Sequence, residues 1–255
     1  MSVIKSLVIA FSMYSKIPVP HLELEEKDMR YVMGFFPLVG VVTGLVMYVL
    51  YKAAYFMHVP DICTSLILMV MPVIITGGIH LDGYMDTCDA RNSYGDREKK
   101  LAILKDSHIG AFAVIRLLVY YVVFFAFTYC IVRSGYDRLV IIWAFTLYLS
   151  RIMSGFAAVN LKGARSKGML HTFTSTADRK SVNIMLVLQL VLCFAGMGLI
   201  NIIQAVIIYA VACAVFLYYR HMAYKEFGGV TGDLAGYLLC VSELCMTIAI
   251  GIMSL

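Results

Sequence analysis

The chain has 255 residues, of which 61% are hydrophobic and 15% are charged. Ordinary soluble domains have about 45–50% apolar and about 25% charged residues, so this composition excludes that class and indicates a membrane protein. The formal net charge is +5, but no basic block with interleaved aromatic residues stands apart from the apolar runs, which argues against nucleic acid as a partner. We therefore expect one integral membrane domain over residues 1–255, with the lipid bilayer as its surroundings.

The N-terminal segment MSVIKSLVIAFSMYSKIPVP has an apolar run that is too short to cross a membrane. Lys5 interrupts this run, and no small-residue cleavage site follows it, so a signal peptide is not indicated. We predict a re-entrant or interfacial helix that ends before Pro18 and Pro20.

Several longer apolar runs follow, each able to cross about 30 Å of hydrocarbon as a helix. They predict an all-α polytopic bundle of about six or seven transmembrane helices. Asn201 lies near the middle of a run that is too long for one crossing, so we expect a tight turn there. The expected spans are 34–57, 62–79, 109–132, 139–160, two within 183–219, and 234–255.

Lysine and arginine are distributed unevenly between the loops that these spans create. Without Lys5, fifteen lie before residue 34 and in the loops 80–108, 161–182 and 220–233, whereas two lie in the loops of the other side. The positive-inside rule places the basic loops in the cytoplasm. We therefore predict a multi-pass protein of the cytoplasmic (inner) membrane, with its long loops on the cytoplasmic side.

Three basic residues fall inside the expected spans. Charges at that depth either extend to the interface or face the bundle interior. We expect the Lys52 side chain to extend to the interface. For Arg116 and Arg151, extension to the interface and a position in the bundle interior both stay open.

An acidic motif, GGIHLDGYMDTCDA (77–90), follows the second expected span. Asp82, Asp86 and Asp89 have the spacing i, i+4 and i+7, so they share one face of a helix. Because carboxylates on one face repel each other, a compensating Mg²⁺ or Mn²⁺ that also binds a substrate diphosphate is a natural hypothesis. The alternative is a solvated acidic loop whose charge is neutralised by nearby Arg and Lys residues.

The other basic loops bring further polar residues to the same side of the membrane. KDSHIGAF (105–112), ARSKGM (164–169) and GGVTGD (228–233) each precede or follow an expected span, and Glu243 lies about three turns into the last helix. His80 and His108 flank the aspartates and are candidate general bases or phosphate donors, or simply polar residues of the interface.

These blocks, in this order, resemble the cobalamin synthase family, the adenosylcobinamide-GDP ribazoletransferases. The similarity runs from IPVP (17–20) and GFFPLVG (34–40) to the last helix. It implies a Mg²⁺-dependent membrane enzyme that transfers the phosphocobinamide group from adenosylcobinamide-GDP to α-ribazole or α-ribazole 5′-phosphate and releases GMP. A homo-oligomer, or a complex with other corrinoid-pathway enzymes, is among the expected assemblies.

Site residues follow from the residue chemistry and this resemblance together. The expected metal ligands are Asp82, Asp86, Asp89 and Asp106. The expected catalytic residues are Asp82, Asp86, Asp106, His80 and His108, and the acceptor hydroxyl could lose its proton to Asp106, Asp233, His80 or His108. The expected substrate-binding residues are Lys105, Ser107, Arg165, Arg91, Thr231, Asp233 and Glu243.

Two alternatives share the acidic helix at a membrane face. One is a transferase of the CDP-alcohol or prenyl-diphosphate kind. The other is a cation transporter, although transporters more often hold their charged residues near the membrane midplane.

Overall fold

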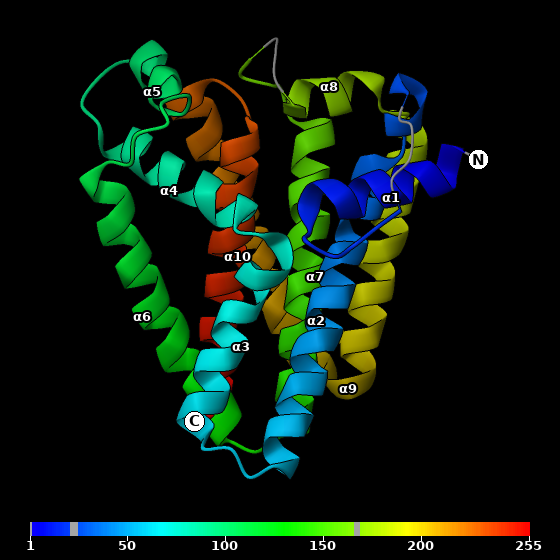
Figure 1. The fold of residues 1–255 in the computed structure, drawn as a ribbon, viewed down its shortest axis with the longest axis vertical. Helices are drawn as coiled ribbons and strands as arrows, with labels where there is room; N and C mark the ends of the chain where they lie inside the picture. The colour runs from blue at the N-terminus through cyan, green and yellow to red at the C-terminus, as the bar shows by residue number, and fades with distance from the viewer. Residues whose placement is uncertain (1, 21–24, 166–168) are drawn as a thin grey trace.

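The fold is a bundle of helices, seen in a computed structural model that describes residues 2–20, 25–165 and 169–255 (Figure 1). In these ranges the only β-type pairing is an isolated bridge between Gly163 and Val230. The elements are α1 (Ser2–Tyr14), the 3₁₀ helix η1 (Glu26–Met29), α2 (Val32–Phe56), α3 (Asp61–Thr76), α4 (Ile79–Asn92), α5 (Arg97–Ile103), α6 (Ala111–Arg133), α7 (Asp137–Asn160), α8 (Met169–Thr176), α9 (Arg179–Met222), the π-helical turn η2 (Ala223–Phe227) and α10 (Gly232–Met253). The predicted all-α class is confirmed.

Five of the described helices, α2, α6, α7, α9 and α10, are long and apolar enough to cross a membrane. Within the most apolar 18-residue stretch of each helix, 78% of the residues are buried in α7 but only 22% in α6. α7 is therefore the central helix, and α2, α9 and α10 pack around it. Apolar side chains on the outward faces of α6 and α9 are exposed because lipid, rather than protein, is their neighbour.

The long helix α9 is two antiparallel helices joined at Asn201, whose φ of −161° and ψ of 111° are not helical. The Tyr209 hydroxyl donates a hydrogen bond of 2.7 Å to the carbonyl of Leu190, 19 residues earlier. In one continuous helix these residues would lie about 28 Å apart, so the chain must reverse between them. The Asn201 side chain accepts from the amide of Gln204 and caps the second helix. The expected turn is confirmed.

α2 and α7 approach closely at two glycines spaced by four residues. A Cβ atom on Gly40 would lie 2.3 Å from the carbonyl oxygen of Leu147, and one on Gly44 would lie 2.6 Å from that of Ala144. Small residues at this spacing let two membrane helices pack backbone against backbone. This contact fixes α2 against the centre of the bundle.

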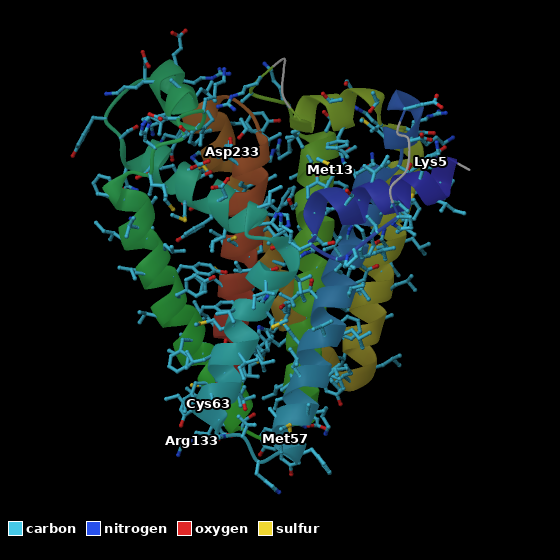
Figure 2. The ribbon with its side chains drawn as sticks, in the orientation of Figure 1. Lys5, Met13, Met57, Cys63, Arg133 and Asp233 are labelled. Carbon is cyan, nitrogen blue, oxygen red and sulfur yellow. The ribbon has the colours of Figure 1, made fainter. Side chains whose placement is uncertain are left out.

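The two ends of the bundle differ in shape. The connections 57–60 and 134–136 and the C-terminus gather at one end, near the labelled Met57, Cys63 and Arg133 in Figure 2. α5, α8, η2 and the labelled Asp233 lie at the opposite end, which we call the loop end (Figures 1 and 2). α1 lies across the bundle near the loop end and does not cross it, in agreement with the expected interfacial helix.

The expected span 62–79 is shorter in the structure, because α3 ends at Thr76. Gly77 and Gly78 have φ values of 67° and 83°, a conformation that residues with a Cβ atom rarely adopt. α4 begins directly afterwards and is bent by 94° from α3. The acidic motif therefore runs across the loop end of the bundle toward α6 instead of continuing out of it (Figure 1).

The three basic residues of the expected spans have different surroundings. Lys52 forms an ion pair of 2.6 Å with Asp137 at the end opposite the loops. Arg116 is exposed on α6, five positions from its first residue, where its side chain can extend to the interface. Arg151 is completely buried in α7.

Candidate functional site

The acidic helix α4 is held against the first turns of α10. A Cβ atom on Gly83 would lie 2.8 Å from Cα of Asp233, and one on Gly236 would lie 2.7 Å from the carbonyl oxygen of His80. The two backbones can approach this closely only because both positions are glycine. The contact brings Asp233 next to the aspartates of α4.

Of the three aspartate side chains on α4, Asp89 is the only one with hydrogen bonds to the described part of the chain. Its carboxylate accepts from the amides of Gly110 at 2.7 Å and Ala113 at 2.9 Å, at the start of α6. Asp89 thus satisfies unpaired N–H groups at the start of that helix. Asp82 is exposed and Asp86 half-buried, and Asp86 experiences the negative charges of Asp82, Asp89 and Asp233.

A cavity of about 320 Å³, which we call the acidic groove, lies between α1, α2, α4, α7 and α10. Asp82 and Asp233 supply its carboxylates, and His80 also lines it. Tyr14, Met33 and Phe36 line it too and form an apolar wall. One groove thus combines negative charge with an aromatic surface.

A larger cavity of about 910 Å³, the basic cavity, lies at the loop end beside α8 and η2. Gly232 and Asp233 line both cavities, so the two are contiguous at the start of α10. Four basic side chains and the predicted Thr231 line the basic cavity. The basic side chains are those of Arg97, Lys162, Arg165 and Arg179.

Arg165 connects the acidic and basic parts of the site. One of its Nη atoms donates to the carbonyl of Leu101 at 2.6 Å, and the other lies 3.8 Å from a carboxylate oxygen of Asp233. Arg165 faces Asp233 on α10, but Asp82 and Asp86 on α4 have no basic partner within the described ranges. The negative charge on α4 is therefore left partly uncompensated.

The donor chemistry of the acidic groove fits Mg²⁺. Within the described ranges no three His, Cys, Asp or Glu side chains already surround one point. Mg²⁺ commonly binds through one or two carboxylates and completes its octahedron with water and substrate phosphates. Asp82, which lines the groove, and Asp86, about one helical turn further along α4, can serve in that way, and the metal roles of Asp82, Asp86, Asp89 and Asp106 remain predictions.

The segment between α5 and α6 lies outside both cavities, although it supplied four predicted site residues, Lys105, Asp106, Ser107 and His108. These side chains are exposed, and Asp106 accepts from the His108 amide at 3.0 Å and contacts its Nδ1 at 2.6 Å. The hydrogen bonds from His108 hold the pKa of Asp106 below its usual value. Asp106 is therefore a weaker base than a free aspartate, and the catalytic roles of this segment remain predictions.

Two further predicted site residues have protein partners instead of facing either cavity. Arg91 lies 3.2 Å from a carboxylate oxygen of Glu226 and donates at 2.7 Å to the Tyr237 hydroxyl. Glu243 is buried and paired with Arg151. The structure thus gives both residues positioning contacts, and their predicted substrate contacts remain untested.

His80 lines both the acidic groove and a small cavity of about 30 Å³. That cavity is also lined by Arg151 and Glu243, and it is large enough for about one water molecule. Nε2 of His80 and Nη2 of Arg151 are buried without a protein hydrogen-bond partner within the described ranges. Of the four bases considered from sequence, His80 and Asp233 are the two that line the groove.

Comparison with known proteins shows which family the chain belongs to. The family model described as cobalamin-5-phosphate synthase matches residues 6–251. The chain belongs to the cobalamin-5-phosphate synthase family. That membership confirms the resemblance expected from the motifs.

Curated members of the cobalamin-5-phosphate synthase family match over nearly their whole length. A protein of Lachnoclostridium phytofermentans named adenosylcobinamide-GDP ribazoletransferase is 43% identical over 97% of this chain and 93% of its own. Proteins of the same name from Clostridium botulinum strain Alaska E43 and Geotalea daltonii are 33% and 29% identical, over 94% and 92% of this chain and 94% and 91% of their own. No solved structure matches.

The sequence motifs did not select several residues that line the two cavities of this candidate site. Arg97, Lys162 and Arg179 had contributed to the positive-inside count but were not assigned to a site. Tyr14 belongs to the expected interfacial helix and Phe36 to the expected span 34–57, and neither was assigned to a site. Their shared position depends on how α1 lies across α2, which no local pattern indicates.

Proposed function

We propose that this chain transfers the phosphocobinamide group from adenosylcobinamide-GDP to α-ribazole or α-ribazole 5′-phosphate and releases GMP, with Mg²⁺ as cofactor and Mn²⁺ as a substitute. The observation that carries the proposal is the contiguity of an acidic groove with a basic cavity in a member of this family. Metal-binding carboxylates beside phosphate-binding cations are the parts that transfer of a diphosphate-linked group requires.

The residues of the site have separable tasks in this reaction. The acceptor hydroxyl forms a bond to the phosphorus that carries cobinamide, the bond from that phosphorus to GMP breaks, and the hydroxyl proton passes to Asp233 or His80. Arg165 stabilises the negative charge that collects on the departing GMP. The apolar wall of Tyr14 and Phe36 suits the aromatic base of α-ribazole. Asp82 and Asp86 would hold Mg²⁺, which would neutralise the charge of the substrate phosphates.

An assay with the purified protein tests this proposal. Incubation with adenosylcobinamide-GDP, α-ribazole and Mg²⁺ is expected to yield a corrinoid nucleotide and an equal amount of GMP. Both products are measured by chromatography. Turnover of a CDP-lipid or a prenyl diphosphate without corrinoid product would favour the other transferase class. Ion flux in liposomes without any GMP release would favour a transporter.

We further propose that the loop end faces the cytoplasm of a cell with this protein in its inner membrane. The fifteen-to-two distribution of Lys and Arg supports this orientation. In intact cells, a variant with Tyr94→Cys as its one cysteine should resist a membrane-impermeant maleimide, because this exposed position lies at the loop end. A matched Met57→Cys variant, exposed at the opposite end, should be labelled. The reverse pattern would contradict the orientation.

A further inference from the structure

We propose that the basic cavity binds the guanosine diphosphate half of the donor, and that the acceptor nucleoside occupies the acidic groove. This division of the site rests on the proposed function and adds the location of each substrate half. It assigns binding roles to Lys162, Arg179 and Arg97, which neither the motifs nor the family resemblance selected.

The charge of the basic cavity favours a polyanionic ligand. Its four basic side chains come from the start of α5, the 161–165 loop and the start of α9, whereas Asp233 at its boundary is its one acidic lining residue within the described ranges. Repulsion among gathered cations is relieved when phosphate oxygens bind between them. A diphosphate offers more such oxygens than the single phosphate that the acceptor can carry.

Backbone contacts fix the loop that carries two of these cations. The amide of Val230 donates to the carbonyl of Lys162, and the amide of Ala164 donates to the carbonyl of Val230, each at 2.9 Å. The Lys162 amide also donates to the Tyr224 hydroxyl at 2.9 Å. Gly229, with a φ of 156°, allows this approach, since a Cβ atom there would lie 2.4 Å from the Lys162 carbonyl oxygen. The backbone that carries Lys162 and Arg165 is thus held in place before a ligand arrives.

The size and position of the basic cavity agree with a nucleotide. Its volume of about 910 Å³ lies at the upper end of the range of about 300–1,000 Å³ for small-molecule sites. Its boundary with the groove passes Asp233 and Arg165. A nucleotide seated there would place its diphosphate at that boundary, where the acceptor hydroxyl can reach it.

Binding of GDP to the full-length protein in nanodiscs of zwitterionic lipid, measured by titration calorimetry, tests the inference. Lys162→Gln and Arg179→Gln are each expected to weaken GDP binding by about 10-fold, because each removes a charged hydrogen-bond donor to phosphate. Both side chains are exposed, so the variants should fold. Lys180→Gln is the matched control: it removes the same charge one residue from Arg179, outside the cavity lining, and should change binding less than 2-fold.

Several results would overturn the assignment. They are unchanged GDP affinity in both variants, an equal loss in Lys180→Gln, or a loss of affinity for α-ribazole 5′-phosphate with GDP binding intact. A change confined to nanodiscs that contain phosphatidylglycerol would assign the cations to lipid headgroups instead. Failure of this inference is separable from failure of the proposed function: transfer with unchanged GDP affinities contradicts only the former, and the expected GDP pattern without any transfer contradicts only the latter.

Discussion

Replacement of Asp82 by asparagine is expected to lower the rate of GMP release by at least about 10²-fold without unfolding the protein. The Asp82 side chain is exposed to the acidic groove and has no hydrogen-bond or ion-pair partner in the described part of the chain, so the fold does not depend on its charge. Asparagine keeps the shape but removes the negative charge that a hard cation needs. The rate should be measured with saturating substrates over a Mg²⁺ titration, in which the variant should require more metal.

Asp61→Asn provides the matched control for Asp82→Asn. Asp61 is an exposed aspartate in the first turn of α3, at the opposite end of the bundle. It should retain the wild-type rate and metal dependence. Unchanged turnover in Asp82→Asn, at every Mg²⁺ concentration, would remove Asp82 from the reaction and would redirect attention to Asp233.

Replacement of Arg151 by methionine is expected to destabilise the protein by about 3–5 kcal/mol, because it leaves the Glu243 carboxylate without its charge partner. Arg151 is completely buried and Glu243 is 4% exposed. Arg151 also donates to the carbonyl of Leu147 at 2.7 Å, and Ser150 donates to Glu243 at 3.0 Å. The expected loss corresponds to a fall in Tm of roughly 10 °C for a chain of this size, measurable by thermal unfolding in detergent.

A double replacement separates the ion pair from simple packing. In Arg151→Met with Glu243→Leu both charges are removed, so most of the lost stability should return. A double variant no more stable than Arg151→Met would show that packing around the guanidinium, and not the unpaired carboxylate, causes the loss. If Arg151→Met were as stable as the wild type, the contribution assigned to this ion pair would be contradicted.

Much of the fold follows from the length of apolar runs and the distribution of Lys and Arg. The reversal at Asn201 was predictable because 183–219 is too long for one crossing. The 94° bend after α3 was not, since apolar residues 62–76 run directly into Gly77 and Gly78 and hydropathy does not register a positive φ. The paired glycines were a signal for the bend, but they fit close helix packing equally well.

The site was predictable in its parts and not in its grouping. Helical periodicity correctly placed Asp82, Asp86 and Asp89 on one helix. Periodicity could not show that Asp89 would satisfy amides of α6, because that contact spans 21 residues of chain. For the same reason, Glu243 could be placed in the last helix but its pairing with Arg151, 92 residues earlier, could not. Contacts between distant segments depend on the packing of whole helices.

The packing of α4 on α10 has a consequence for the biogenesis of the protein. The acidic motif is made before Asp233 and Gly236, which belong to α10, complete the groove and support α4. Until α10 has inserted into the bilayer, α4 lacks the helix against which it packs. The groove also lacks Asp233, the carboxylate that faces Arg165. The acidic groove therefore forms only after both helices have been made and have packed against each other.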